Sequence, residues 1–232
     1  MLEAHGLRAS YGKSQVLHGI DLAVGAGQVV SLMGRNGMGK TTTLRALMGL
    51  NALDAGRVTF GGADITGLSA NRIATAGIGW VPEGRRIFPT LTVAENLAMA
   101  ARHARTGHWH LATVYELFPR LRQRQANLGI NLSGGEQQML AIGRALMSNP
   151  KLLLLDEATE GLSPMVRAEI WKCVADLKAR GEAILLVDKH LNALRRIADF
   201  YYVLERGQVV WSGTAADLEG SLDRVEAFLR VA

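Results

Sequence analysis

Residues 34–41 read Gly34-Arg35-Asn36-Gly37-Met38-Gly39-Lys40-Thr41. This is the pattern G-x-x-x-x-G-K-[ST], which is typical of a loop that holds nucleotide phosphates. The glycines let the backbone curl so that successive N–H groups point at one anion. The Lys40 ammonium suits the outer phosphates and the Thr41 hydroxyl suits Mg²⁺. We expect these residues, together with Thr42, to bind a nucleotide.

The residues on either side of this loop favour the same interpretation. Residues 29–33 form a mostly apolar run that is typical of a buried strand, and residues 42–49 have a helical pattern. The loop therefore leads into the N-terminus of a helix, which is itself a site where anions bind. A plain glycine-rich turn is the alternative, and this strand–loop–helix context disfavours it.

The composition limits the class of protein. The chain has 232 residues, of which 48% are hydrophobic, enough for one domain with a sizeable core. Its formal net charge is +5, but the basic residues are scattered, so we expect no nucleic-acid partner. A solvated face, or proximity to acidic lipid headgroups, explains the same charge. The single cysteine, Cys173, excludes an intramolecular disulfide, and we expect it to be a small buried residue.

Targeting and membrane-spanning segments are not expected. Residues 1–5 carry no apolar signal region, and no apolar run approaches the roughly 18 residues of a transmembrane helix. We therefore expect a cytosolic chain that does not cross a membrane by itself.

Strand and helix patterns alternate along most of the chain. Strands are predicted at 2–7, 16–24, 29–33, 56–62, 78–82, 151–156, 183–188, 200–205 and 208–212, the last two as a hairpin about Arg206-Gly207. Helices are predicted at 42–49, 93–104, 111–117, 136–148, 165–179, 191–198 and after the hairpin. This order predicts an α/β fold with a parallel sheet and helices on both faces. Residues 1–83 and 150–232 would form the core of a single domain, and residues 84–149 a helical insertion.

A second acidic motif ends a buried strand. Residues 151–157 read Lys-Leu-Leu-Leu-Leu-Asp-Glu, and such a leucine run is typical of a strand covered on both faces. Ligands of open α/β sheets bind at the carboxyl ends of the strands. We expect Asp156 to hold Mg²⁺, directly or through water, and Glu157 to polarise the attacking water. A strand that merely ends in acids is the alternative, which the phosphate loop disfavours.

Residues 132–138 read Leu-Ser-Gly-Gly-Glu-Gln-Gln. Ser133 and Glu136 have the spacing of a capping box at a helix start. Capping does not explain the adjacent glycines at 134 and 135, which weaken a first helical turn unless something must approach the backbone closely.

The string Leu-Ser-Gly-Gly-Glu-Gln, between the phosphate loop and the acidic strand end, resembles the signature of the ATP-binding cassette (ABC) transport ATPases. The resemblance covers essentially the whole chain. It implies a P-loop NTPase (RecA-like) parallel-sheet core with an antiparallel β subdomain and an inserted helical subdomain, using ATP and Mg²⁺. Two such domains would face each other head to tail. Ser133, Gly134 and Gly135, with Gln137 beside them, would then contact the ATP bound to the partner.

Further site residues follow from the same resemblance. Tyr11 matches the aromatic residue that stacks on adenine, and Val16 would pack beside that ring. Glu83 stands where the family has a glutamine that senses Mg²⁺ and contacts the membrane partner, and a carboxylate can also bind a hard cation. Residues 158–164 take the place of the loop that crosses the dimer interface.

One position departs from the family pattern. The histidine that senses the terminal phosphate follows the strand after the acidic motif as Val-x-His, whereas this chain reads Val187-Asp188-Lys189-His190. Three interpretations are open: His190 reaches the phosphate through a shifted turn, Lys189 replaces it, or the site is weakened. A fourth is that His190 only starts a helix and has no catalytic role.

Three segments, 81–89, 132–146 and 160–164, look like the LivF-type ATPases of bacterial branched-chain amino acid importers. That resemblance implies a second ATPase, LivG-type or a further copy of this chain, beneath two membrane permeases fed by a periplasmic binding protein. The chain would lie in the cytoplasm, peripherally on the inner face of the cell membrane. A close relative serves urea and short amides, and nothing in such an ATPase contacts the cargo.

Two other classes of function stay open. Translation and DNA-repair factors of this family usually carry two cassettes or long coiled-coil insertions, and this chain has neither. A regulatory subunit would close on ATP but barely hydrolyse it, which the displaced His190 permits and Glu157 argues against.

Overall fold

An antiparallel sheet opens the chain. In the computed structural model, which describes residues 1–12, 14–101 and 106–229, this sheet has four strands in the order β2-β1-β4-β5. Its strands are β1 Leu2–Tyr11, β2 Ser14–Val24, β4 Ala55–Phe60 and β5 Ala63–Asp64. Alternate residues of β1 and β2 are buried, as expected for a sheet with one face on a core.

A second sheet forms the centre of the molecule. It has six strands in the order β10-β9-β3-β8-β7-β6, all parallel except β10, which pairs antiparallel with β9. Its strands are β3 Val29–Gly34, β6 Ile78–Val81, β7 Leu152–Asp156, β8 Ala183–Val187, β9 Phe200–Glu205 and β10 Gln208–Thr214. Every residue of β3, β7 and β8 is buried, because both faces of the parallel part are covered.

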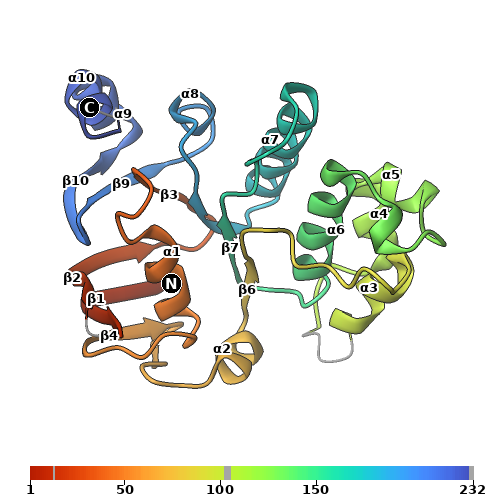
Figure 1. The fold of residues 1–232 in the computed structure, drawn as a ribbon, viewed down its shortest axis with the longest axis horizontal. Coiled ribbons are helices and arrows are strands. Elements are labelled where there is room, and N and C mark those ends of the chain that lie inside the picture. The colour runs from red at the N-terminus through yellow and green to blue at the C-terminus, as the bar shows by residue number, and fades with distance from the viewer. Residues whose placement is uncertain (13, 102–105, 230–232) are drawn as a thin grey trace.

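Helices cover the two faces unequally (Figure 1). On one side lie the antiparallel sheet, α1 Lys40–Leu47 and α2 Ala70–Ala76. On the other side lie α7 Pro164–Ala179, α8 Leu191–Leu194, α9 Ala215–Gly220 and α10 Leu222–Leu229. The leucines of β7 contribute alternately to the two sides, since Leu152 and Leu154 join one apolar core and Leu153 and Leu155 the other.

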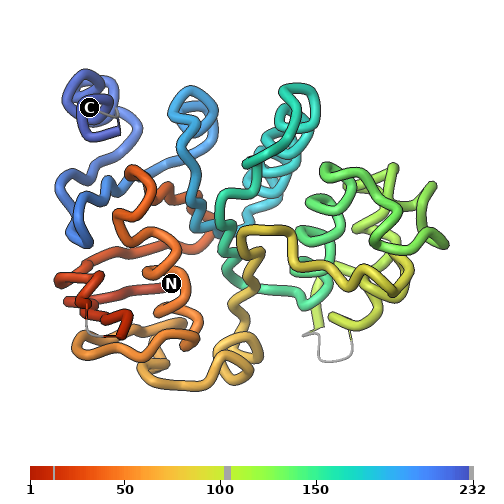
Figure 2. The backbone as a smooth tube through the Cα atoms, in the orientation of Figure 1, coloured from red at the N-terminus to blue at the C-terminus, as the bar shows by residue number. Residues whose placement is uncertain are grey.

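A group of helices separates β6 from β7. It comprises α3 Val93–Ala101, α4 Leu111–Leu117, α5 Pro119–Gln123, the 3₁₀ helix Gly129–Asn131 and α6 Gly134–Leu146. The chain leaves the central sheet at β6, forms this group to one side and returns at β7 (Figure 2). Its apolar residues, such as Val114 and Leu121, are continuous with the core around α7.

The predicted fold class is confirmed, with differences at element ends. The helix predicted at 136–148 begins at Gly134, because Ser133 caps it. The helix predicted at 191–198 ends at Leu194, because the chain tightens into a turn that lets the Asp199 N–H reach Val29 O in the central sheet at 2.7 Å. For the helix predicted at 93–104, residues 102–104 lie outside the described residues. Three short elements, β5, α2 and α5, were not predicted from the sequence.

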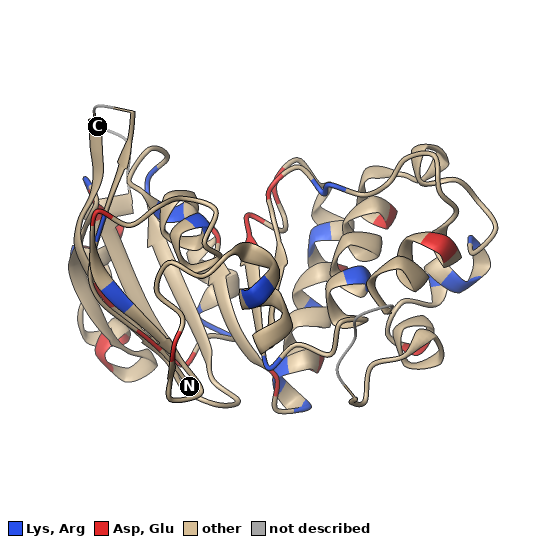
Figure 3. Ribbon diagram, turned by 90° about the horizontal axis from the view of Figure 1, so that it is seen from below, with Lys and Arg blue, Asp and Glu red and all other residues tan. Residues whose placement is uncertain are grey.

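Two predictions about composition can be compared with the structure. Cys173 is buried on α7, as expected, and burial raises the pKa of its thiol to about 12. Lysines and arginines are interspersed with aspartates and glutamates along the chain (Figure 3).

Among the described residues, no helix has the length and apolar character needed to cross a membrane.

Candidate nucleotide-binding site

The phosphate loop leaves the end of β3 and enters α1. Gly34 and Gly39 adopt φ values of 147° and 103°, in the region that favours glycine. A Cβ at Gly34 would lie 2.5 Å from the carbonyl oxygen of Leu204, and a Cβ at Gly39 would lie 3.0 Å from Leu17 Cδ2. Glycine at these two positions of the motif therefore has a steric cause: the loop passes tightly between β9 and β2.

Lys40 is folded back over this loop. Its Nζ donates to the carbonyl oxygens of Gly34 at 2.9 Å and Arg35 at 3.0 Å, and lies 3.7 Å from Glu157 Oε1. Burial lowers the pKa of Lys40, while the negative charges of Glu157 and Asp156 oppose that shift. The ammonium is thus held by the same loop whose N–H groups would cradle phosphates, so little reorganisation is needed for it to meet an anion.

Thr41 and Asp156 meet where α1 begins and β7 ends. Thr41 Oγ1 donates to Asp156 Oδ1 at 3.2 Å, whereas the buried Asp156 Oδ2 has no hydrogen-bond partner among the described residues. Burial is the main cause that raises the pKa of Asp156 to about 6, and the nearby Glu83 carboxylate adds to it. An orphaned carboxylate oxygen beside a hydroxyl and a second carboxylate is the all-oxygen donor set that suits Mg²⁺.

Glu157 directly follows β7. Its φ of 47° is left-handed, and its N–H donates to Val187 O at 2.9 Å. A hydrogen bond with the Glu160 carboxyl, together with burial, raises the pKa of Glu157 to about 7. One oxygen from each of Glu83, Glu157 and Glu160 lies within 4.8 Å of the others. A carboxylate with this pKa beside the phosphate loop can accept a proton from water near neutral pH.

These groups surround a pocket of about 390 Å³. Its lining brings together Val16, Asn36, Gly37, Gly39, Lys40, Thr41, Thr42, Glu83, Glu157 and Glu160. All but Glu160 were predicted as site residues from the sequence. A second hollow of about 590 Å³ shares Thr41 and Glu83 with it and also contains Asp156, Arg45 and Arg86. The phosphate loop, the acidic end of β7 and the segment after β6 therefore converge on one cleft.

A comparison with known proteins identifies the family to which this chain belongs. Residues 17–160 match the model of the family described as ABC transporter. The chain belongs to the ABC transporter family. Members of this family hydrolyse ATP, and this chain is an ATP-binding, ATP-hydrolysing subunit, as the resemblance predicted.

Individual relatives of this ABC protein extend the match over nearly its whole length. The high-affinity branched-chain amino acid transport ATP-binding protein BraG of Pseudomonas aeruginosa is 43% identical, with 94% of each chain covered. The lipopolysaccharide export ATP-binding protein LptB of Haemophilus influenzae is 35% identical, covering 92% of this chain and 90% of that one. A solved ATP-binding subunit of an ABC transporter has a TM-score of 0.85 at 27% identity, with 99% of each chain covered.

The signature segment of the ABC protein starts α6. The Ser133 N–H donates to Glu136 Oε2 at 2.8 Å and the Glu136 N–H to Ser133 Oγ at 3.3 Å, so the capping box is confirmed. A Cβ at Gly134 would lie 2.7 Å from Arg85 Nη1, and a Cβ at Gly135 would lie 2.3 Å from Val166 Cγ1. The close approach that the glycines suggested is thus made, within this chain, by Arg85 and α7.

The signature residues do not line the pocket of their own chain. Gln137 instead donates to Gly129 O at 3.2 Å. Their contact with ATP on a partner, inferred from the family resemblance, stays a prediction.

Other predicted residues lie around the rim or behind the loop. Tyr11 is 72% exposed at the β1–β2 turn, an accessible ring for stacking. Arg35 contributes its carbonyl to Lys40. Met38 lies against the β9–β10 turn, where its Sδ and carbonyl oxygen accept the N–H groups of Arg206 and Gly207, both at 3.1 Å.

Lys189 and His190 point to different neighbours. Lys189 Nζ donates to Glu160 Oε1 at 2.8 Å. His190 Nδ1 lies 2.6 Å from Asp188 Oδ1, and its Nε2 lies 2.9 Å from Arg167 Nη1. His190 is absent from the pocket lining and instead borders a hollow beside α10. Glu160, which was not predicted as a site residue, connects Lys189 to the pocket.

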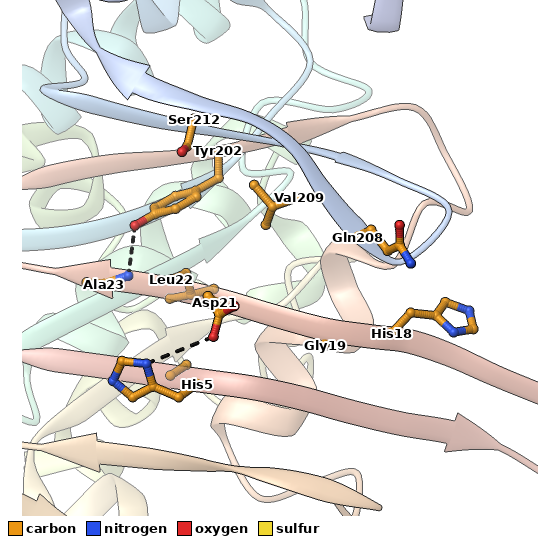
Figure 4. Close-up of a pocket in the computed structure, with 11 residues that line it drawn as sticks. His5, His18, Gly19, Asp21, Leu22, Ala23, Tyr202, Gln208, Val209 and Ser212 are labelled. Atoms are coloured by element: carbon orange, nitrogen blue, oxygen red, sulfur yellow. Dashed lines mark hydrogen bonds and ion pairs between the residues drawn. The ribbon is translucent and has the colours of Figure 1, made fainter.

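A separate hollow of about 500 Å³ lies between β2 and the β9–β10 hairpin (Figure 4). Tyr202 Oη accepts the Ala23 N–H there at 3.0 Å, and His5 Nδ1 lies 3.9 Å from Asp21 Oδ1. None of the residues predicted from the sequence to bind a ligand lines it. The contact of Tyr202 with β2 ties the two sheets together.

Proposed function

We propose that this ABC ATPase energises the import of branched-chain amino acids into a bacterial cell. The observation that carries the cargo is the 43% identity to BraG, a branched-chain amino acid transport protein, over 94% of both chains. The segments at 81–89, 132–146 and 160–164 support the same LivF-type branch. LptB, the ATP-binding protein of a lipopolysaccharide export system, is 35% identical, so the family by itself does not specify the cargo.

The reaction follows from the residues around the pocket. The loop N–H groups and Lys40 bind the phosphates and stabilise the charge that develops during phosphoryl transfer. Glu157 orients and deprotonates the attacking water. Thr41, Asp156 and Glu83 would hold Mg²⁺, which neutralises charge on the outer phosphates when it is bound. Tyr11 and Val16 would hold the adenine, with Asn36 and Thr42 completing the loop.

The coupling to transport requires other chains. A second cassette, LivG-type or a further copy, would place its phosphate loop opposite Ser133, Gly134, Gly135 and Gln137. Two membrane permeases would dock near residues 83–89, and a periplasmic binding protein would deliver the cargo to them. The 232-residue chain, with its helical part at 84–149, would then act as a single cassette at the cytoplasmic face of the membrane. ATP binding would close the cassettes, and hydrolysis would reopen them.

The test is uptake of labelled leucine and labelled urea in source cells that carry Lys40→Ala. Loss of leucine uptake with urea uptake intact supports the proposal. The reverse result assigns the chain to the urea and short-amide branch, and unchanged uptake of both removes the transport role. Lys172→Met is the matched control, because Lys172 forms an exposed pair with Asp176 at 2.9 Å, remote from the pocket.

A regulatory subunit is the second candidate, and one observation favours it. His190 is engaged with Asp188 and Arg167 and does not line the nucleotide pocket. Phosphate release by the purified chain separates the two functions. A chain that binds ATP with no measurable turnover, alone or with its partner cassette, would be regulatory.

A further inference from the structure

The Arg85 side chain lies directly on the signature segment at the start of α6. A Cβ placed on Gly134 would be 2.7 Å from Arg85 Nη1 and 3.0 Å from its Nη2 and Cζ, so the flat guanidinium rests on that glycine. Nη1 also donates to Gln137 Oε1 at 3.4 Å, and Nη2 would be 3.9 Å from a Cβ at Gly161. The guanidinium therefore lies between the signature segment and the 158–164 loop, the two parts of the chain expected to face a second cassette.

The positive charge of Arg85 is not balanced by an acid among the described residues. In that part of the chain it forms no ion pair, and its side chain makes a single hydrogen bond, to Gln137. It also lies at the N-terminus of a 13-residue helix, whose partial positive charge disfavours a cation. The acid of the first helical turn, Glu136, is engaged elsewhere, because it accepts the Ser133 N–H at 2.8 Å and lies 3.7 Å from Arg124 Nε. Two positive features therefore meet where the described residues provide no acid.

The backbone around Arg85 is held in an unfavourable conformation that keeps the side chain at this place. Arg85 and Arg86 have φ values of 65° and 44°, in the left-handed region that disfavours residues with a Cβ. The chain after them is fastened, since Arg144 Nη2 donates to Arg86 O at 2.5 Å, and Asn96 bonds the N–H and the carbonyl oxygen of Phe88, both at 2.9 Å. Strain that neighbouring bonds maintain is typical of functional positions.

The ligand that suits this arrangement is a phosphate group. A guanidinium presents N–H donors in one plane that match two phosphate oxygens, and the backbone N–H groups at a helix start bind the same group. A phosphate would thus compensate the guanidinium and the helix end together. The phosphate loop of this chain, with Lys40, lines a different pocket, and Arg85 does not line that pocket.

From this geometry we infer that Arg85 binds ATP in trans: its guanidinium contacts the phosphates of the nucleotide held by the phosphate loop of the opposite cassette. The inference rests on the proposed head-to-tail pairing, which brings that nucleotide to Ser133, Gly134 and Gly135. These three residues are uncharged, so Arg85 supplies the cation on their side of the site. Lys40 and Arg85 serve the same ATP from two different chains.

Phosphate release and nucleotide displacement by the purified full chain test this role. Arg85→Met should lower phosphate release by about tenfold or more, because a charge-assisted contact to the nucleotide is lost. Nucleotide binding by dilute, unpaired chains should stay within about twofold, since the phosphate loop is untouched. Arg85→Lys should keep most of the activity and Arg85→Gln little, because only lysine keeps the charge. Arg122→Met, which removes an exposed cation from α5, is the control and should change neither quantity.

Complementation shows which chain Arg85 serves. In an equal mixture of Arg85→Met and Lys40→Ala chains, half of the dimers hold one intact site and one site with both defects, so about a quarter of the wild-type activity should return. Where hydrolysis requires a LivG-type cassette, Arg85→Met should add no loss to a variant of that cassette without its phosphate-loop lysine, because both defects fall in one site.

Three results would overturn the inference. Unchanged phosphate release in Arg85→Met would leave Arg85 without a role at the site. No recovery with Lys40→Ala, under conditions in which Ser133→Arg does recover, would place Arg85 in the site of its own chain. Equal activities of Arg85→Lys and Arg85→Gln would mean that Arg85 only supports the fold of the signature segment, and thermal unfolding of each variant measures that support. Failure of the wild-type chain to bind ATP would instead overturn the proposed function.

Discussion

At the scale of single residues, the site places charged groups where burial works against them. Asp156 is buried with one oxygen unpartnered, and Glu157 shares a hydrogen bond with Glu160 in a cluster of acids. Each arrangement is unfavourable in the nucleotide-free chain and becomes favourable when cations and phosphates arrive. Residues of this kind lower the stability of the folded chain, and they are retained because they bind the nucleotide and its metal ion.

Glu157→Gln should separate binding from hydrolysis. The amide keeps the size of the side chain but cannot accept the proton of water, so phosphate release should fall about 100-fold or more. ATP binding should stay within about threefold, because the phosphate loop is untouched. Phosphate release and nucleotide displacement measure the two quantities. Glu169→Gln, which removes an exposed partner of Arg120, is the control. Undiminished turnover would remove Glu157 from its role.

Asp156→Asn should stabilise the metal-free, nucleotide-free chain. Since burial raises the pKa of Asp156 to about 6, the folded chain binds a proton between pH about 4 and 6 that the unfolded chain has released. The stability of the wild type therefore falls as pH rises through this window. At pH 7.5 the variant should be more stable by on the order of 1–3 kcal/mol, and the gap should close toward pH 4.

Urea unfolding in a chelating buffer at several pH values measures this difference. Asp176→Asn, which alters an exposed acid on α7, is the matched control. A gap that did not vary with pH would show that lost packing, and not the ionisation of Asp156, sets the stability.

At the scale of elements, Trp109 joins the helical group to the central core. Its Nε1 donates to Oε1 of Glu182, the residue just before β8, at 2.6 Å. The Trp109 N–H donates to Asn149 Oδ1 at 2.6 Å, and Asn149 Nδ2, from the segment before β7, donates to the Trp109 carbonyl oxygen at 2.8 Å. Burial raises the pKa of Glu182, and the hydrogen bond from Trp109 opposes that shift. The segment before α4 is therefore tied to the chain just before β7 and just before β8.

Trp109→Phe should lower the free energy of unfolding by about 1–3 kcal/mol, because it leaves a half-buried carboxylate without its donor. The Trp171→Phe variant is a close control. Trp171 Nε1 is also buried but has no hydrogen-bond partner among the described residues, so its loss removes no such bond. Urea unfolding of the two variants gives the comparison. Equal destabilisation would mean that ring volume, and not the bond to Glu182, is what matters.

The elements also show how far the sequence predicts this molecule. The phosphate loop, the capped start of α6 and the strand that ends in Asp156 each depend on neighbouring residues, so their local patterns predicted them. The Lys189–Glu160 pair joins residues 29 positions apart, on two loops that only the order of strands brings together. The close approach of Arg85 to Gly134 also joins two segments that are far apart in the sequence. Such contacts have no local signal, and short elements such as α2 and β5 have too few residues to show a periodicity.

At the scale of the whole molecule, the phosphate loop and the signature segment serve different pockets. Lys40 lines the pocket of its own chain, and Ser133 does not. If two copies pair head to tail, each ATP site contains Lys40 from one copy and Ser133 from the other. Variants at the two positions should then complement each other.

Lys40→Ala and Ser133→Arg should each abolish hydrolysis in a pure preparation, because every site contains the defect. In an equal mixture, half of the dimers carry one intact site and one site with both defects, so about a quarter of the wild-type activity should return. Phosphate release after mixing measures it, and a mixture of two Lys40→Ala preparations is the control. No recovery would mean that the copies do not form the site together, and the same mixing repeated with a LivG-type cassette would then identify the partner that supplies the second half.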